Sequence, residues 1–406
     1  MNAILQQHQR VLSGMRTTGR LHLGHYHGVL KNWLKLQQQY ECYFFAADWH
    51  ALTTHYATPE VIRESLQELF IDWLAVGVDP TKASLFVQSD VPEHAELHVL
   101  LSMITPLGWL ERIPSYKDQQ QKLTDKMLDT FGFLGYPLLQ SADILIYKAS
   151  LVPVGEDQVA HIEFAREIAR RFNRLYGNPP DFLQQVMSSL KKMDKASMQR
   201  FAAWRTAHQE HGDKEACQSA KGLIAGHASL GEQDREFLLG YLEGGGKVIL
   251  PEPQVLLTKA AKLPGIDGQK MSKSYNNTIC LREDAAVVTQ KIKTMPTDPA
   301  RVRRTDPGDP VKCPVWGLHQ IFSSAETQAW VQQGCKSAGI GCIECKQPVI
   351  KAVLEEQQPI AERAAYYRNK PDEVQAIITE GAAKARAVAR ETLGEVKAAM
   401  GLGKIN

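Results

Sequence analysis

Short apolar runs alternate with helical patterns along the first part of the chain. The pattern predicts strands at Val11–Gly14, Glu41–Ala47 and Ala83–Gln88, and helices at Gly24–Gln39, Thr58–Val76 and Glu93–Met103. Strands that alternate with helices indicate an α/β fold with a parallel sheet covered on both faces. Ligands of such sheets bind beyond the carboxyl ends of the strands. The residues that fall there are Gly14, Thr17, Thr18, Asp48 and His50.

The remainder of the chain divides into regions of different character. After a helical stretch at Leu123–Met127, a second strand–helix unit runs through Leu139–Tyr147 and Val152–Gln158 into a helix at His161–Phe172. Helical patterns without obvious strands follow and end in a flexible Gly244-Gly245-Gly246. We expect a core formed by residues 1–177 and 248–300, a helical insertion at 178–247 and an all-helical domain at 301–406.

Composition excludes several classes of protein. The 406 residues are 44% hydrophobic and 23% charged, which is ordinary for a globular protein of two or three domains. A net charge of +2 argues against a dedicated polyanion binder, although a local basic face could still bind RNA. No run approaches the length of a membrane span, and the first residues lack the apolar core of a signal peptide. We expect a cytoplasmic protein without a membrane partner, with its cysteines as thiols or metal ligands.

Two short motifs far apart in the chain predict one chemistry. His22-Leu23-Gly24-His25 opens a helical pattern, and Lys270-Met271-Ser272-Lys273-Ser274 lies in a Gly-rich stretch much later. Phosphates bind at helix N-termini, and lysines on a loop can stabilise the charge that grows on departing pyrophosphate. In this order, the motifs predict a site that binds ATP and promotes attack on its α-phosphate. Each motif alone has a simpler interpretation: the histidines as caps, the lysines as solvated loop charges.

Further motifs resemble those of class I aminoacyl-tRNA synthetases, and among them the tryptophanyl enzymes. Apart from Asn178–Lys247, nearly the whole chain takes part. The matching stretches, besides the two motifs, are Ser13–Gly19, Asp48–Ala51, Glu111-Arg112 with Lys117, Ser141–Leu145, Val152–Gln158 and Ala399–Gly403. The resemblance implies a Rossmann-type doubly wound core, a helical domain that reads the anticodon, and a homodimer. It also implies that L-tryptophan is activated with ATP and Mg²⁺ and transferred to tRNA(Trp).

The resemblance also implies roles for individual residues. Those implied for catalysis are His22, His25, Lys117, Lys270 and Lys273. ATP would further contact Arg16, Thr17, Thr18, Gly24, Gly155, Asp157, Gln158, Met271 and Ser272. Leu12, Gly14, Val152 and Val154 would line the tryptophan pocket, where His50 and Gln158 would hold the polar end of the amino acid. Gln140 stands where many relatives have Met, so the resemblance gives less guidance on how the indole is oriented.

Asp143 lies between apolar residues, where a carboxylate is costly to bury without a partner. One interpretation is an N-cap or a buried ion pair. The functional interpretation is an acceptor for the indole N–H, which can only donate. A pocket built around that hydrogen bond would reject phenylalanine.

Four of the seven cysteines are clustered: Cys313, Cys335, Cys342 and Cys345, with spacing C-x21-C-x6-C-x2-C. Four converging thiolates suit an iron–sulfur cluster or a structural zinc, and four unrelated thiols are the simpler alternative. Zinc sites more often use two CxxC pairs, and this pattern has one. The pattern resembles a subset of tryptophanyl synthetases that carry a [4Fe-4S] cluster, which favours iron over zinc.

Three other functions compete with this interpretation. Tyrosyl-tRNA synthetases share the fold and can have Asp at the position of Asp143, but related ones place Tyr in the first strand, where this chain has Leu12-Ser13. Nucleotidyltransferases share the HxGH motif but are usually shorter and lack the KMSKS motif. A synthetase-like RNA-binding protein would have lost catalytic groups that this chain retains.

Overall fold

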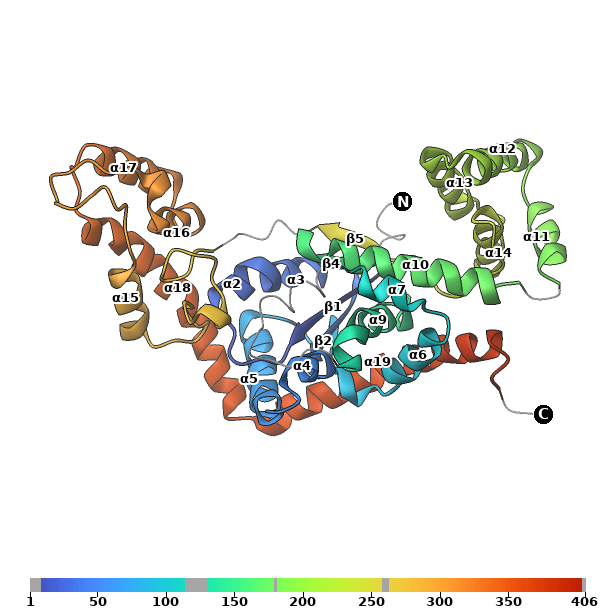
Figure 1. Cartoon of the computed structure of the whole chain (residues 1–406), viewed down its shortest axis with the longest axis horizontal. Helices are drawn as coiled ribbons and strands as arrows, with labels where there is room; N and C mark the ends of the chain where they lie inside the picture. Colours follow the sequence, from blue (N-terminus) through green and yellow to red (C-terminus); the bar gives the residue numbers. More distant parts are fainter. Residues whose placement is uncertain (1–8, 114–129, 179–180, 258–262, 404–406) are drawn as a thin grey trace. The chain divides into compact units, whose positions relative to one another are not determined.

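A computed structural model describes residues 9–113, 130–178, 181–257 and 263–403 (Figure 1). Its strands form one five-stranded sheet in the order β3-β2-β1-β4-β5. The strands are β1 (Arg10–Arg16), β2 (Glu41–Ala47), β3 (Ala83–Val87), β4 (Leu151–Val154) and β5 (Gln254–Leu257). The parallel pairs β2–β3 and β1–β4 confirm the predicted α/β class.

The first helix is continuous but not regular. It consists of α2 (Leu23–His25), the π-helical turn η1 (Tyr26–Leu30) and α3 (Lys31–Leu36). The π-turn begins directly after the HLGH motif. Such turns are rare in proteins, and those that occur often lie at functional sites. The sequence pattern predicted this helix but gave no sign of the turn.

Most other predicted helices are present within a few residues of their expected bounds. In the strand–helix units, α5 (Glu60–Val76), α6 (Glu93–Ser102) and α10 (Val159–Tyr176) were predicted. Three further helices were not predicted: α4 (Asp48–His55), α7 (Leu107–Glu111) and α9 (Phe131–Ile146). Most of Leu139–Tyr147 lies in helix α9, so the strand of this strand–helix unit is β4 and does not include Leu139–Tyr147. The expected helix at Leu123–Met127 lies outside the described residues.

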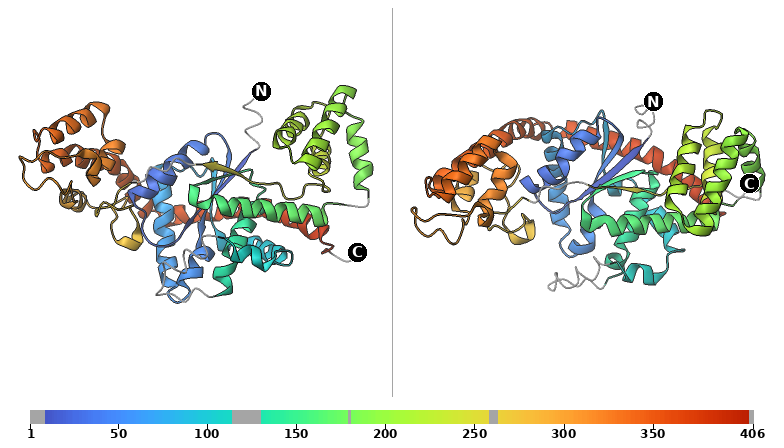
Figure 2. Two further views of the ribbon diagram at one scale, coloured as in Figure 1. Left: turned by 45° about the horizontal axis from the view of Figure 1, so that its top comes forward. Right: turned by 90° about the horizontal axis from the view of Figure 1, so that it is seen from above.

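The region after α10 is helical, as its composition indicated. It contains α11 (Phe182–Leu190), α12 (Lys195–His211), α13 (Lys214–Gly226) and α14 (Glu232–Leu242). Helices α11–α14 pack side by side (Figure 2). They share a small core of their own, in which Phe182, Phe201 and Leu238 are buried. A separate core explains why this segment reads as a distinct helical insertion.

The C-terminal third is helical from residue 285 onward. It contains α15 (Ala285–Thr294), α16 (Pro314–Phe322), α17 (Ala325–Lys336), α18 (Cys342–Arg368) and α19 (Pro371–Ala399). Contacts between Cα atoms divide the chain into two compact units, one of residues 14–87 and 257–381, the other of residues 9–13, 88–256 and 382–406. The predicted four-part division remains a prediction.

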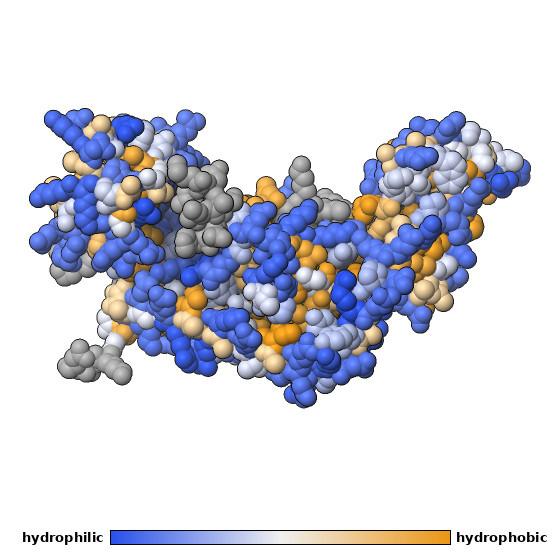
Figure 3. Space-filling model, turned by 180° about the vertical axis from the view of Figure 1, so that it is seen from behind, coloured by the Kyte–Doolittle hydropathy of each residue, from blue (hydrophilic) through white to orange (hydrophobic). Residues whose placement is uncertain are grey.

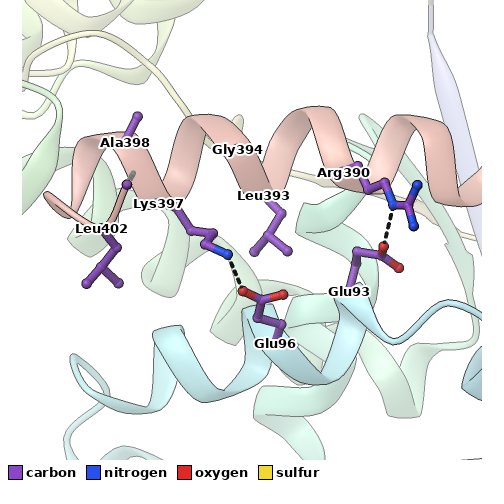
Figure 4. Close-up of a pocket in the computed structure, with 9 residues that line it drawn as sticks. Glu93, Glu96, Arg390, Leu393, Gly394, Lys397, Ala398 and Leu402 are labelled. Carbon is purple, nitrogen blue, oxygen red and sulfur yellow. Dashed lines mark hydrogen bonds and ion pairs between the residues drawn. The ribbon is translucent and has the colours of Figure 1, made fainter. Parts of the chain in front are cut away.

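Two ion-pair groups join α19 to α6 (Figure 4). Glu93 accepts hydrogen bonds from Arg386 and Arg390, both at 2.9 Å, and Glu96 accepts one from Lys397 at 2.6 Å. Leu393 points between the two groups. The family-like tail at 399–403 therefore follows a helix that charged side chains hold against the strand–helix unit.

Apolar side chains inside the fold come from both strands and helices. Strand β2 is almost wholly buried, and its Phe44 stacks on Trp33 of α3 with ring centroids 4.0 Å apart. Hydrophilic residues cover much of the face seen in Figure 3, with apolar residues visible between them. Within the described ranges, no helix is long and apolar enough to cross a membrane.

Candidate active site

The two histidines of the HLGH motif are held by the backbone of their own turn. His22 is the N-cap of α2, and its Nδ1 accepts a hydrogen bond from the Gly24 N–H at 3.1 Å. His25 Nδ1 accepts from the His22 N–H at 3.2 Å. A neutral imidazole that accepts at Nδ1 carries its proton on Nε2. Both rings can therefore present an Nε2–H donor, which is the group that a phosphate oxygen requires.

Burial keeps these imidazoles neutral. It lowers the pKa of His22 to about 4, and the positive charge of Lys273 acts in the same direction. Burial also holds the pKa of His25 well below its usual range, with further contributions from His22 and Lys273. The ring centroids lie 3.7 Å apart. The capping interpretation and the functional one are therefore compatible, because Nδ1 caps while Nε2 remains the donor.

Gly24 is required by this geometry. A Cβ at that position would lie 2.9 Å from the His22 imidazole, closer than real Cβ contacts come. A larger residue would displace the ring from its cap. The glycine therefore serves the position of His22, whatever it contributes to a ligand.

Lys273 of the second motif lies against the loop after β1. Its Nζ donates to the carbonyl oxygens of Thr18, at 3.0 Å, and Gly19, at 2.8 Å. Burial lowers its pKa to about 8, although the carboxylate of Asp72 acts in the opposite direction. The charge of Lys273 therefore acts on both histidines, and its side chain is largely shielded from solvent. Lys270, by contrast, is exposed.

Asn277 organises the KMSKS loop, and the sequence gave no reason to select it. The side chain is buried; its Oδ1 accepts from the Ser272 N–H at 2.7 Å, and its Nδ2 donates to the Lys270 carbonyl at 3.1 Å. Nearby Gly268 has φ +84°, a backbone conformation that favours glycine. Asn277 therefore fixes the turn that carries both lysines, while Met271 is buried beneath it.

The residues at the end of β1 differ in their burial and in their hydrogen-bond partners. Gly14 is exposed, and a Cβ there would lie 2.6 Å from the Phe45 ring. Arg16 donates to the His50 carbonyl at 3.0 Å and to Thr54 Oγ1 at 2.5 Å. Thr17 is fully buried, and its contact with ATP stays a prediction.

Asp143 is buried in α9 within a hydrogen-bonded network. Its Oδ1 lies 2.7 Å from the Gln88 amide, which donates, and 2.6 Å from His94 Nδ1. His94 Nε2 in turn lies 2.6 Å from the Tyr147 hydroxyl. The buried-partner interpretation of Asp143 therefore describes the chain without substrate, and the indole contact stays a prediction.

A second pair lies one helical turn earlier on α9. Gln140 Oε1 is 2.6 Å from Nδ1 of the buried His161 on α10, and the Tyr136 hydroxyl is 3.4 Å from Nε2 of the same ring. Sequence reasoning missed His94 and His161, because each is a single histidine in an ordinary helical pattern.

The other predicted ligand-binding residues are placed as follows. Leu12 and Val152 are buried, and Val154 is half-buried in β4. Gly155 precedes the 3₁₀ turn of Glu156–Gln158, where Asp157 is exposed and Gln158 donates to it at 3.3 Å. Lys117 lies outside the described residues.

The four clustered cysteines lie in one region around α16–α18, and none is in a disulfide. Burial raises the pKa of Cys345 to about 12, and thiolate charges on Cys313, Cys335 and Cys342 act in the same direction. Cys345 Sγ lies 3.4 Å from Nε2 of His319, a buried residue that sequence reasoning did not select. Within the described chain, no three His, Cys, Asp or Glu side chains are arranged to hold a metal ion.

Comparison with known proteins gives a consistent result. A sequence profile of the family "tRNA synthetases class I (W and Y)" matches residues 5–199 and 234–356. The chain is 64% identical to the tryptophan–tRNA ligase of Ralstonia nicotianae, with 97% of this chain and 98% of that protein covered. It is 44% identical to the tryptophan–tRNA ligase of Thermotoga maritima, with 97% and 99% covered.

Solved structures agree. The tryptophanyl-tRNA synthetase of Campylobacter jejuni, complexed with ADP and tryptophan, has a TM-score of 0.71 at 27% identity, with 97% of this chain and all of that chain covered. The tyrosyl-tRNA synthetase of Archaeoglobus fulgidus, at 19% identity and a TM-score of 0.54, covers 89% of this chain and 92% of its own and shares the fold alone.

Proposed function

Because the chain belongs to the class I tRNA synthetases of the tryptophan and tyrosine family, we propose that it activates L-tryptophan with ATP and transfers it to tRNA(Trp). The observation that carries the chemistry is the cluster of His22, His25 and Lys273 around the start of α2. Two neutral imidazoles lie side by side, and one ammonium group is close enough to act on both by its charge; these are the donors that a phosphate-transfer site requires.

In the first step, a carboxylate oxygen of tryptophan attacks the α-phosphorus of ATP. The bond from that phosphorus to the bridging oxygen breaks, and pyrophosphate leaves with the electron pair. The Nε2–H groups of His22 and His25 donate to phosphate oxygens, and the ammonium of Lys273 stabilises the growing negative charge. Mg²⁺, when bound to ATP, neutralises phosphate charge and orients the phosphates.

In the second step, a ribose hydroxyl at the 3′ end of the tRNA attacks the carbonyl carbon of the tryptophanyl adenylate. AMP leaves, and the amino acid becomes esterified to the tRNA. Arg16, Gly155, Asp157 and Gln158 are assigned to the nucleotide, and the exposed Lys270 is assigned to contact with phosphate.

Selection of tryptophan over tyrosine is assigned to the pocket beside β1 and α9. Leu12 offers no hydroxyl to a phenol, which supports an apolar amino-acid ring at that wall. Asp143 is already paired with Gln88 and His94, so an indole N–H would join an existing network at its carboxylate. Gln140, held by His161, is assigned to the orientation of the ring.

The cysteines are assigned to one [4Fe-4S] cluster, with structural zinc as the alternative. Four neighbouring thiols, one buried and three half-buried, have the chemistry of a soft-metal donor set, because bound metal stabilises the thiolates that burial disfavours. The donor set fits the cluster in its chemistry, although the described side chains are not arranged to hold a metal ion. The cluster would have a structural role in the helical domain assigned to the anticodon.

We further assign the chain to a cytoplasmic homodimer, as the family resemblance implies. The test of the function is pyrophosphate exchange into ATP with each amino acid in turn, followed by charging of tRNA(Trp). Exchange that requires tryptophan supports the proposal, whereas exchange that requires tyrosine, or no amino acid, contradicts it. Light scattering of the purified chain tests the dimer.

A further inference from the structure

Helix α18 contacts the segment that follows the HLGH motif through one carboxylate. Glu356 Oε2 lies 2.7 Å from His27 Nε2, and Glu356 Oε1 accepts from Lys31 Nζ at 2.6 Å. His27 lies in the π-turn η1, and Lys31 is the first residue of α3. The same Lys31 Nζ is 3.3 Å from His27 Nδ1. The three side chains therefore form a closed ring of hydrogen bonds across two helices.

The protonation of this ring follows from its geometry. The ammonium of Lys31 can only donate, so His27 Nδ1 accepts from it, and the N–H at His27 Nε2 donates to the Glu356 carboxylate. Burial alone would raise the pKa of Glu356, but the hydrogen bonds from His27 and Lys31 hold it below its usual value. His27 is nearly buried, so the contact is shielded from solvent on that side.

The next residue of α18 reaches the second motif. Gln357 is buried, and its Nε2 donates to the carbonyl of Cys280 at 2.7 Å. Cys280 forms an antiparallel bridge with His22, six residues beyond the KMSKS motif. Around the bridge, Leu23 N–H donates to Ile279 at 3.0 Å, and Leu281 N–H donates to Leu21 at 2.9 Å. This short ladder joins the N-terminal end of α2 to the segment that leaves the KMSKS loop.

We propose that Glu356 and Gln357 are positioning residues for amino-acid activation, which keep the HLGH helix and the KMSKS exit segment in register. This inference rests on the proposed function. The π-turn is a rare conformation directly after the HLGH motif, and its His27 side chain contacts Glu356. One pair of adjacent residues on α18 supplies a partner to each motif. Both residues contact segments beside the two motifs, so they act on the reaction through His22, His25 and Lys273.

The consequence for catalysis is a loss of alignment. A misplacement of about 1 Å far from the reacting atoms can cost about 100-fold in rate. We expect Glu356→Gln to lower kcat for tryptophan-dependent pyrophosphate exchange by about 10- to 100-fold, because the phosphate contacts of the two motifs stabilise mainly the transition state. The KM for tryptophan should stay within about twofold of the wild-type value, since the amino acid is not held by this contact.

The matched control is Glu355→Gln. Glu355 is the preceding residue on the same helix, is exposed, and lies 3.8 Å from Lys351. Its variant removes the same charge from α18 and should leave kcat unchanged. Gln357→Met tests the second contact without a charge change, and the double variant Lys31→Met/Glu356→Gln should lose no more than Glu356→Gln alone, because both remove one interaction.

Each outcome decides between the alternatives. A wild-type enzyme without tryptophan-dependent exchange would overturn the proposed function itself. An active wild type with an unchanged Glu356→Gln variant would overturn only the positioning role. Equal losses in Glu355→Gln and Glu356→Gln would assign the effect to helix charge. A rise in the KM for tryptophan in parallel with the fall in kcat would indicate general disruption, as would a large fall in the unfolding midpoint.

Discussion

Lys273→Ala is the most direct test of the active-site geometry. The variant removes an ammonium group that donates to two backbone carbonyls and that lies close enough to His22 and His25 to lower their pKa values. Loss of one preorganised transition-state donor typically costs about 100- to 1,000-fold in kcat, or about 2.7–4 kcal/mol. We expect a loss in this range for adenylate formation and little change in tryptophan affinity.

The pKa of Lys273 adds a second readout. With a pKa of about 8, about nine in ten of these side chains are charged at pH 7. The rate that depends on the ammonium should therefore fall as the pH rises through about 8. Lys273→Arg should stay charged at alkaline pH, so its rate should not fall as the pH rises through about 8, although the planar guanidinium differs in shape from the ammonium. The pKa of Lys273 is about 8 in the folded chain and 10.5 in the unfolded chain, so the unfolded chain binds more protons between these values. The contribution of Lys273 to the free energy of unfolding therefore rises with pH between about 8 and 10.5.

The assay is pre-steady-state formation of tryptophanyl adenylate, measured with saturating ATP at several pH values. Lys351→Ala is the control, because it removes the same charged group from an exposed position on α18 outside both motifs. A Lys273→Ala variant that reacts at the wild-type rate would refute the assignment. So would a variant whose main defect is weaker tryptophan binding.

Three further predictions concern the fold around the site. Asp143→Ala should lower the free energy of unfolding by about 3–5 kcal/mol, because buried His94 and Gln88 lose their partner, and it should weaken both tryptophan binding and the rejection of phenylalanine. Unfolding in urea measures the stability and competition binding measures the selectivity; a variant of wild-type stability would contradict the first expectation. Gly14→Ala should cost about 1–3 kcal/mol, since its Cβ would lie 2.6 Å from Phe45, and an unchanged midpoint of unfolding would show that the ring moves freely. Cys342→Ser should remove the broad visible absorbance of anaerobically purified protein and lower the stability of the helical domain; stoichiometric zinc in a colourless wild type would replace iron with zinc, and a metal-free wild type would refute the site.

Much of the fold was predictable because its signals are local. The predicted strand at Glu41–Ala47 coincides with β2, since an apolar run between turn signals has few alternatives in a parallel sheet. Helices such as α5 and α6 followed their apolar periodicity to within a few residues. Leu139–Tyr147 was the exception, because a short apolar run cannot be told from a buried helix by periodicity alone.

The sequence by itself determined which chemical groups are present and in what order: two histidines around a glycine, a lysine-rich loop, and four closely spaced cysteines. Only the tertiary structure decided how these groups act. The burial of Lys273 and the ring joining Glu356 to His27 depend on partners that are distant in the chain. The proton position on His22 and His25 depends on the exact geometry of their own turn, which the letters of the motif do not give. Motifs are local in sequence, whereas hydrogen-bond partners and desolvation are properties of the packed chain, and these set pKa values and orientation.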